Sequence, residues 1–431
     1  MTKKNISSKN KLNILTKFII LFTIVLAIAS LTFLFYSNNK YQNKLDKERI
    51  YLNIISKYSE YVTTIKETKL YKLENDNYVE SGILNKKVNI KLAPLDITSD
   101  TLYFPLADMD YYISYKDVVK ADKEETNTRY KEYIPFNKNI KTKSPTNFYD
   151  KDNNLIMTIN DTFNFPIIIN DTDRFGISYL DKLYYIKNED VLATEKTKNT
   201  SVETRTNIRT FAYHTVYKKG SEKCTNMYVC HTIEQFDSHM KYLHDNNYLT
   251  LTMEELEMFL DGKIRIPKKT VVITLDDGRR LYNSVPIVEK YQINSTFFVI
   301  ASLTNNKLKD YLGKTTYAKF ESHTYDMHNN WQCSGGTQGS QLLCEKNDKI
   351  IADIEKSREI LGGTSYYFAY PFYDYNENLI NIIKKLDFHL AFVGVADSNG
   401  FSDSKTDKYK VRRLTIWGDC NLDEFKTYIN E

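Results

Sequence analysis

Apolar and polar positions alternate differently in successive parts of the chain. Residues 18–36 are nineteen positions without a charge, long enough for a helix to cross the hydrocarbon core of a bilayer. Residues 37–69 are polar with scattered Leu, Ile and Tyr, and they predict a helical stalk. Short β-rich runs separated by Asn and Asp turns fill 70–195, and a polar linker follows at 196–207. From 208 to 431 amphipathic helices alternate with strand-like runs, which predicts an α/β domain.

The β-rich part contains a repeat. Its members share a tyrosine pair before an isoleucine and, further upstream, a Phe-Pro pair: Tyr111-Tyr112-Ile113 with Phe104-Pro105, and Tyr184-Tyr185-Ile186 with Phe165-Pro166. We therefore expect two small barrel or sandwich modules, at 70–127 and 128–195. They weakly resemble small wall-binding barrels of the Src-homology type, and both wall binding and mere spacing stay open as their role.

The residues before the apolar segment favour one orientation of a membrane helix. They include several lysines and no acidic residue: Lys3, Lys4, Lys9, Lys11 and Lys17. The positive-inside rule places 1–17 in the cytoplasm and everything after Tyr36 outside. A cleaved signal peptide is the alternative, because Ala27-Ile28-Ala29 resembles a cleavage site. The apolar run continues past that site to Phe35, so we expect an uncleaved anchor at 18–36.

Two adjacent carboxylates end one strongly apolar run. Thr270 to Leu275 is β-branched and apolar, which predicts a buried strand, and Asp276-Asp277-Gly278 follows it directly. Side chains alternate along a strand and glycine allows a sharp turn, so the two acids can point to different places. One can hold a metal while the other handles a proton. By itself, an Asp-Asp-Gly sequence is more often a simple turn.

Two histidines complete a candidate ligand set. His323 and His328 are five residues apart, which would separate them by about 140° around a helix, so they can share one ion only from a loop or strand end. One carboxylate and two imidazoles leave coordination positions open, as catalytic zinc sites do. Histidine pairs are more often solvated or packed in a core. On the spacing alone, the alternative that these two histidines bind no metal stays open.

These motifs carry a family resemblance. The turn at 275–278, the pair His323 and His328, and the run 368–372 resemble three successive motifs of the polysaccharide deacetylases, carbohydrate esterase family 4. The resemblance covers roughly 208–431 and includes a subgroup similar to poly-N-acetylglucosamine and peptidoglycan deacetylases. It implies a distorted (β/α) barrel of about seven units, with the site at the carboxyl ends of the strands.

The resemblance also implies roles for particular residues. Asp276 would be the general base, and Asp277, His323 and His328 would bind a divalent metal, for which we expect zinc. The N–H of Phe372 would help to bind the oxyanion. Residues expected to contact the sugar are Tyr370, Pro371 and Trp417.

Two departures from the family pattern concern the base and the acid. The family arginine that orients the base is replaced by Ala369, and no histidine follows His389. Arg412 or Arg413 could orient a carboxylate, but an arginine cannot act as the general acid. His389 is a weak candidate for that acid, and His214 could approach the pocket, so the identity of the acid stays open.

Composition adds limits on partners and redox state. A hydrophobic content of 42% is sufficient to form the hydrophobic cores of folded domains. The net charge of +4 is too small to indicate nucleic-acid binding. The five cysteines follow the apolar segment, which is compatible with disulfides outside the cell. The candidate pairs are Cys224 with Cys230 and Cys333 with Cys344, each in a short polar loop. Free thiols are the alternative, and Cys420 is left over.

The combined interpretation is a membrane-anchored extracellular enzyme. It would be a metal-dependent hydrolase that removes acetyl groups from N-acetylglucosamine residues of a cell-surface polysaccharide, either peptidoglycan of the cell wall or a poly-N-acetylglucosamine exopolysaccharide. A catalytically silent glycan-binding or sensor module of the same fold is the alternative, and another metal-dependent amide or ester hydrolase is a third. The sequence predicts no oligomeric state.

Overall fold

The fold is described here from a computed structural model of residues 4–58, 60–94, 103–107, 110–122, 128–198, 202–224, 226–394 and 400–430. Lys3 and part of the expected linker, 199–201, lie outside the described residues. The chain forms two compact units. The first comprises Met1–Thr126, Thr142–Phe163 and Ser178–Ile186, and the second comprises Asn127–Lys141, Asn164–Ile177 and Lys187–Glu431. The segments of the two units alternate along the chain. We expected domains that follow one another in sequence, and that division remains a prediction.

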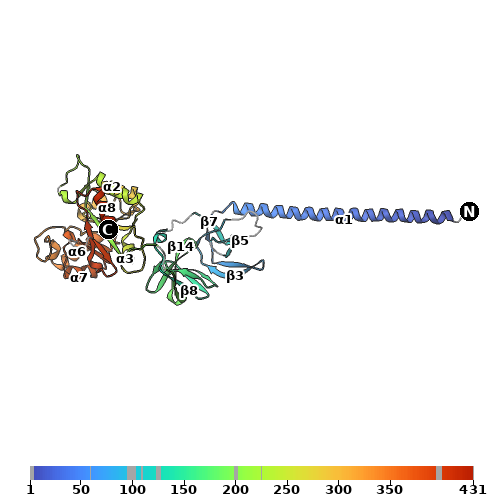
Figure 1. The fold of residues 1–431 in the computed structure, drawn as a ribbon, viewed down its shortest axis with the longest axis horizontal. Helices are drawn as coiled ribbons and strands as arrows, with labels where there is room; N and C mark the ends of the chain where they lie inside the picture. Colours follow the sequence, from blue (N-terminus) through green and yellow to red (C-terminus); the bar gives the residue numbers. More distant parts are fainter. Residues whose placement is uncertain are drawn as a thin grey trace. The chain divides into compact units, whose positions relative to one another are not determined.

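The first unit begins with one long helix, α1 (Lys4–Ile55), which is continuous in Figure 1. Within it, Thr16–Ile54 is the one described helical stretch that is long and apolar enough to cross a membrane, a test that a signal sequence also passes. Its apolar side chains are exposed, Phe18 by 68% and Phe35 by 71%. The helix covers the first part of the expected stalk, 37–69, and ends at Ile55, because the β-rich run that follows forms β1 (Tyr61–Thr64).

Antiparallel strands follow the helix in the described part of the first unit. A three-stranded sheet has the order β4-β1-β7, with β4 at Asn89–Lys91 and β7 at Val118–Ala121. A larger sheet runs in the order β14-β9-β10-β3-β2-β6-β5. Its strands are β14 (Lys182–Lys187), β9 (Thr146–Tyr149), β10 (Leu155–Ile159), β3 (Asn77–Leu84), β2 (Thr68–Glu74), β6 (Tyr112–Ser114) and β5 (Tyr103–Pro105).

The sequence repeat corresponds to a repeated local structure. After β6, the 3-10 turn η1 (Tyr115–Asp117) leads into β7, and after β14 the turn η3 (Asn188–Asp190) leads into β15 (Val191–Lys196). The isoleucines of the two repeats, Ile113 and Ile186, are both fully buried. Each repeat is therefore a strand, a single turn and a second strand, with the isoleucine as a core residue.

The second unit contains short β elements ahead of its main domain. A three-stranded sheet has the order β11-β8-β15, and β12 pairs with β13. The new strands are β8 (Lys138–Thr142), β11 (Asn164–Pro166), β12 (Ile169–Asn170) and β13 (Arg174–Tyr179), preceded by the 3-10 turn η2 (Thr128–Glu132). Arg129 in this turn donates to both carboxylate oxygens of Glu255, each at 2.7 Å.

Parallel strands close into a barrel in the second unit. The cyclic order is β16-β20-β21-β22-β23-β24-β26, and β16 pairs with both β20 and β26 to close it. The strands are β16 (Asn207–Tyr213), β20 (Thr270–Leu275), β21 (Ser295–Val299), β22 (Ala318–Ser322), β23 (Tyr367–Ala369), β24 (Leu390–Gly394) and β26 (Val411–Thr415). The seven-stranded α/β barrel confirms the predicted fold class.

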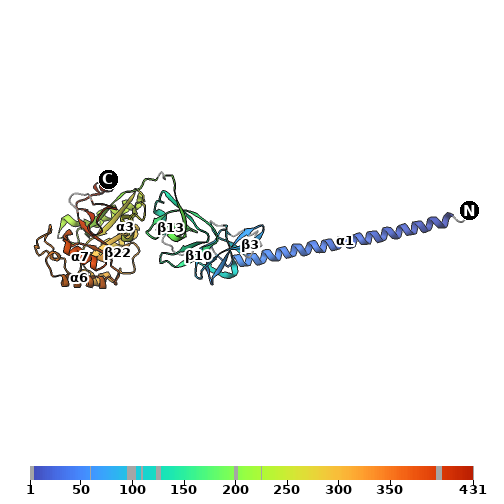
Figure 2. The same cartoon turned by 90° about the horizontal axis from the view of Figure 1, so that it is seen from below.

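Helices cover the outside of the barrel. They are α2 (Ile233–Asp245), α3 (Met253–Leu260), α4 (Leu281–Lys290), α5 (Ala301–Leu308), α6 (Asn347–Ile360), α7 (Glu377–Lys385) and α8 (Leu422–Asn430). Figure 1 and Figure 2 both show α6 and α7 side by side, and their apolar faces share one core cluster. Every residue of β20 is buried, as expected for a parallel strand covered on both faces.

Small strands complete the second unit. They are β17 (Thr215–Tyr217), β18 (Cys230–Thr232), β19 (Leu249–Thr250) and β25 (Phe401–Asp403). β25 pairs antiparallel with the beginning of β16, where Asn207 lies opposite Asp403. That end of the barrel is the amino end of its strands. The opposite, carboxyl end carries the aspartates that follow β20.

Candidate metal centre and active site

The turn after β20 sends two neighbouring carboxylates in different directions. Asp277 has φ +68°, a left-handed conformation that aspartate adopts more readily than most residues. Gly278 has φ +71°, and a Cβ there would lie only 2.6 Å from Cγ1 of Val299. Only glycine fits this position, because both the backbone conformation and the space exclude a side chain. The sharp turn leaves Asp276 buried and Asp277 partly exposed.

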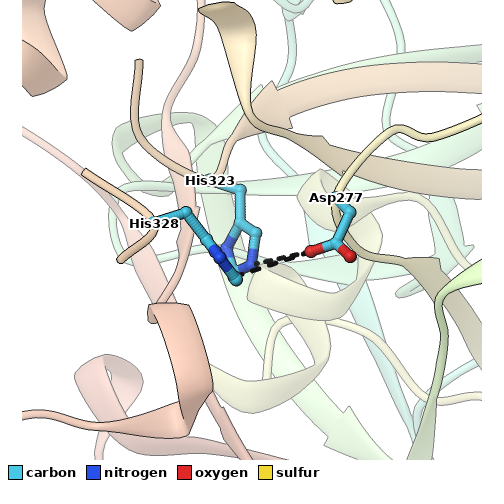
Figure 3. A group of neighbouring side chains, drawn as sticks. All are labelled: Asp277, His323 and His328. Carbon is cyan, nitrogen blue, oxygen red and sulfur yellow. Dashed lines mark ion pairs between the residues drawn. The ribbon is translucent and has the colours of Figure 1, made fainter. Parts of the chain in front are cut away.

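Asp277 meets the two predicted histidines. Its Oδ1 lies 3.5 Å from Nε2 of His328 and 3.8 Å from Nε2 of His323, and Figure 3 shows these atoms converging. The three ligand atoms all lie within 4.8 Å of one another. Among the described residues this is the one group of three His, Cys, Asp or Glu side chains arranged in this way. The arrangement is a possible metal-binding triad.

The protein fixes the ring orientation of His323. Its Nδ1 lies 2.7 Å from the carbonyl oxygen of Ala369, which can only accept, so Nδ1 carries the hydrogen and Nε2 keeps its lone pair toward Asp277. Burial, which outweighs the nearby carboxylates, lowers the pKa of His323 to about 4. The pKa of His328 is lowered too, mainly by burial. Both rings are therefore neutral near pH 7, as metal ligation requires.

A carboxylate on the neighbouring helix shapes the loop between the histidines. Asp353 in α6 accepts hydrogen bonds from the backbone N–H groups of Tyr325 at 2.8 Å and Asp326 at 2.9 Å. Asp353 occupies a buried position on the helix face that also carries Ile350 and Ile354. We did not predict it, although a carboxylate within an apolar helix face is a usable signal for such a role.

Asp276 is held by a buried arginine. Arg413 in β26 donates from Nη1 to Oδ1 at 2.7 Å and from Nη2 to Oδ2 at 2.8 Å, and both side chains are almost completely buried. Burial alone would raise the pKa of Asp276, but the charge of Arg413 and its hydrogen bond lower it to about 2. The carboxylate is therefore ionised, and the two-pronged contact fixes its orientation.

The third predicted motif forms a tight turn beside the triad. In the 3-10 turn η6 (Pro371–Tyr373), Phe372 has φ +58° and ψ +14°, and its ring centroid lies 4.4 Å from that of His328. Tyr373 hydrogen-bonds through its hydroxyl to Oγ1 of Thr415 at 2.8 Å, and the guanidinium of Arg413 lies 5.4 Å from its ring centroid. This turn thus borders both the triad and the salt bridge between Asp276 and Arg413.

Comparisons with known proteins identify this region. Residues 263–391 match the sequence model of the polysaccharide deacetylase family. The chain contains a polysaccharide deacetylase domain. Over 176 residues it is 30% identical to a poly-beta-1,6-N-acetyl-D-glucosamine N-deacetylase of Staphylococcus aureus (strain MRSA252). That match covers 37% of this chain and 59% of the relative, so the chain spans less than two thirds of the relative's length.

Two solved structures are also similar to this chain. The Streptococcus pyogenes deacetylase PplD in complex with acetate has a TM-score of 0.43 at 20% identity, covering 53% of this chain and 99% of that one. IcaB from Ammonifex degensii has a TM-score of 0.43 at 22% identity, covering 52% of this chain and 97% of that one.

In the deacetylase domain, some of the residues expected to orient the base or contact the sugar are buried and others are exposed. Arg413 contacts Asp276, whereas Arg412, its neighbour on the strand, is exposed, because side chains alternate across β26. Trp417 is 49% exposed and can meet a ligand. Tyr370 is fully buried against Phe368 and Tyr375, and Pro371 is buried as well. Neither side chain is exposed in this structure, and the expected sugar contact of Tyr370 and Pro371 stays a prediction.

The candidate acid His389 and the histidine that could approach the pocket, His214, lie at opposite ends of the deacetylase barrel. His389 precedes β24, at the amino end, and its Nδ1 lies 3.0 Å from Glu257, so it is remote from Asp276. His214 follows β16, at the carboxyl end, with its ring centroid 6.4 Å from that of Tyr373. Its Nδ1 is buried and has no hydrogen-bond partner within the described part of the chain.

Disulfides join both candidate cysteine pairs in the deacetylase domain. Cys224 is bonded to Cys230 and Cys333 to Cys344, with Cα–Cα distances of 6.3 Å and 5.8 Å, and Cys420 is a buried free thiol. The loop between Cys333 and Cys344 is held by Asp374. That carboxylate accepts from the backbone N–H groups of Thr337 at 2.6 Å and Ser340 at 3.0 Å. Asp374 thereby ties this loop to the turn at Phe372, a link that the sequence did not predict.

Proposed function

We propose that the chain is a metal-dependent N-deacetylase of N-acetylglucosamine polymers. The observation that carries the proposal is the convergence of Asp277, His323 and His328 beside an ionised carboxylate, Asp276, which Arg413 holds in place. This combination provides a candidate metal centre and a separate proton acceptor, two groups that can together promote hydrolysis of an acetamide by water.

The donor set fits zinc. Two imidazole nitrogens and one carboxylate oxygen are ligands that catalytic zinc sites use, and they leave positions open for water and substrate. Bonds of about 2.0–2.2 Å around a tetrahedral ion imply ligand atoms roughly 3.5 Å apart. The distances of 3.5 Å and 3.8 Å from Asp277 to the two histidines are close to that value, and all three ligand atoms lie within 4.8 Å of one another.

The proposed chemistry divides between the ion and the protein. When bound, zinc supplies Lewis acidity toward the acetyl carbonyl and makes a nearby water easier to deprotonate. Asp276 would accept the proton of the attacking water, and Arg413 would keep its oxygens aimed at that water. The N–H of Phe372 would donate a hydrogen bond to the developing oxyanion, a contribution whose loss typically costs about a hundredfold in rate.

His214 is our candidate for the proton donor to the leaving amine. It lies at the same end of the barrel as Asp276, and its unpartnered Nδ1 and its place next to Tyr373 support this role. Together with Arg413, it would fill the two roles that seemed missing at Ala369 and after His389. This argues against the catalytically silent alternative.

We further propose that the enzyme works outside the cell and is anchored by α1. The long exposed apolar stretch of that helix and the lysines ahead of it support an uncleaved anchor with the amino terminus inside. The relative from Staphylococcus aureus is named for a poly-N-acetylglucosamine substrate, which supports a polymer of this sugar. Peptidoglycan is the other candidate, because an anchored enzyme faces the cell wall.

The test is acetate release by the full-length protein in detergent. Zinc-loaded wild type is expected to release acetate from peptidoglycan, from poly-β-1,6-N-acetylglucosamine, or from both, and mass spectrometry should find free amines in the products. A chelator should stop the reaction and added zinc should restore it. The absence of acetate from both polymers, with one zinc bound per chain, would overturn the proposal.

A further inference from the structure

A basic pocket adjoins the metal-binding triad. Its volume is about 520 Å³, and Gly278 and Arg279, the residues after Asp277, both line it. The described lining residues include four basic side chains, Lys223, Arg279, Arg280 and Lys307, and no acidic one. The pocket therefore begins at the turn that presents the metal ligand and continues into strongly positive surroundings.

Nearby groups neutralise only part of this charge. Arg280 is paired, with its Nε 3.7 Å from Oε1 of Glu222, and it also donates to the carbonyl of Lys223 at 2.6 Å. Arg279 lies 3.7 Å from Oδ2 of Asp277, but its side chain is 56% exposed, and Asp277 belongs to the triad. Lys307 sits over the ring of Tyr282, with its Nζ 4.6 Å from the centroid. That contact positions the ammonium group without neutralising it.

A second pocket shows that the excess of basic over acidic residues is local to the pocket beside Asp277. It has a volume of about 850 Å³ and is lined by Met227 and Tyr228, from the loop closed by the first disulfide. There Lys219 is accompanied by Glu234 and Asp419, so acidic and basic groups are mixed. A general surplus of lysine therefore does not account for the pocket beside Asp277.

We propose that the basic pocket binds an oxyanion carried by the substrate, a carboxylate or a phosphate, and that the enzyme prefers an anionic N-acetylglucosamine polymer to a neutral one. Guanidinium and ammonium groups recognise such oxyanions by charge-assisted hydrogen bonds. Peptidoglycan carries carboxylates on its peptides, whereas poly-N-acetylglucosamine is neutral where it is acetylated. This inference rests on the proposed deacetylase activity and chooses between its two candidate substrates.

The experiment removes charge from the pocket without touching the proposed machinery. The double variant Lys223→Gln/Lys307→Gln changes two exposed side chains, and Lys405→Gln is the matched control. Lys405 is also exposed and follows β25, at the amino end of the barrel. Full-length proteins are compared on peptidoglycan, on peptidoglycan stripped of attached phosphate polymers, and on poly-β-1,6-N-acetylglucosamine. Acetate release and binding to each insoluble polymer are both measured at low and high salt.

The double variant is expected to raise KM for peptidoglycan by about three- to tenfold and to weaken binding similarly, because each exposed ion pair contributes modestly. High salt should remove the difference from wild type. KM for the neutral polymer should change by less than about twofold, and Lys405→Gln should resemble wild type. An effect that persists on the stripped peptidoglycan assigns the carboxylate, and one that disappears assigns the phosphate.

Equal binding of the wild type and the double variant to peptidoglycan would overturn the inference, as would equal losses on the charged and the neutral polymer. The binding measurement does not depend on turnover. If the wild type released no acetate from any polymer, the proposed activity would fail, but the comparison of binding would still decide whether the pocket recognises an anion.

Discussion

His323 and His328 can be compared with a second buried histidine pair, His231 and His239, in the same unit. Burial lowers the pKa of His231 to about 4 and that of His239 to about 3, much as it lowers that of His323 to about 4. The surroundings differ. His239 stacks on Phe425 at 4.3 Å and meets the hydroxyl of Tyr213 at 3.1 Å, whereas His323 and His328 turn their Nε2 atoms toward Asp277.

The comparison teaches that a lowered pKa alone does not mark a functional histidine. Both pairs are neutral near pH 7, so both satisfy the electrostatic requirement for binding a metal. The pair at the carboxyl ends of the strands adds a carboxylate within ligand distance. The other pair, His231 in β18 and His239 in α2, packs against aromatic rings. Convergence of ligand atoms, and not burial, separates a candidate centre from a core contact.

The strongest test breaks the first pair and leaves the second intact. His323→Ala should lose the bound metal and reduce acetate release to the uncatalysed background, because one of three protein ligands is gone. His239→Gln is the matched control and should keep about one zinc per chain with activity within about twofold of wild type. Metal content is measured by plasma mass spectrometry. Equal metal content in the two variants would contradict the assignment.

A second test separates the two carboxylates of the turn after β20. Asp276→Asn should retain the metal but reduce turnover by about a hundred- to ten-thousandfold, because an amide cannot accept the proton of the attacking water. Asp277→Asn should weaken metal binding as well. Near-normal turnover of Asp276→Asn, measured as acetate release, would remove Asp276 from the mechanism.

A third test uses the neighbouring arginines of β26. Arg413→Lys keeps the charge but loses the two-pronged contact with Asp276, so kcat should fall by about ten- to a hundredfold while metal content stays constant. Arg412→Lys changes the exposed neighbour and should leave kcat unchanged. If both variants behaved alike, the contact between Arg413 and Asp276 would be structural only.

The smallest expected effect concerns the second histidine pair and pH. The folded-state pKa values of His231 and His239 lie below the ordinary value of about 6.5. Between those values and about 6.5 the unfolded chain binds more protons, so the free energy of unfolding falls as the pH drops through this range. Each histidine contributes a slope of up to about 1.4 kcal/mol per pH unit.

Urea unfolding of the full-length protein at several pH values measures this slope. The double variant His231→Gln/His239→Gln should show a shallower loss of stability between pH 6.5 and pH 4 than wild type. A parallel dependence in the two proteins would show that the buried pair does not bind the protons in question.

The sequence predicted the site where a local pattern was sufficient. The apolar run at 270–275, the turn after it and the spacing of His323 and His328 singled out the three residues as candidates, and the family resemblance assigned them as a ligand set. Choosing between Arg412 and Arg413 required the direction of alternation in β26, which depends on how that strand enters the barrel. The burial of Tyr370 depends on its packing against α7, and the link from Asp374 to the disulfide loop joins residues 34 to 37 positions apart.

The β-rich part shows what a local sequence pattern leaves undetermined. The repeat was visible in the sequence, and it forms a repeated strand, turn and strand. The interleaving of the two units was not visible, because it depends on which short strands pair across the chain, and short polar strands carry little information about their partners.

The two-pronged salt bridge between Arg129 and Glu255 affects how this barrel can be produced as a fragment or fused to another protein. The side chain of Glu255 is only 6% exposed, and Tyr133 also donates to it, at 2.8 Å. A fragment that starts at the linker would leave that carboxylate buried without its cation, a loss on the order of a few kcal/mol. We therefore expect a fragment that folds on its own to begin ahead of Arg129, and a fusion protein that contains only the barrel to bury the charge of Glu255 without its partner.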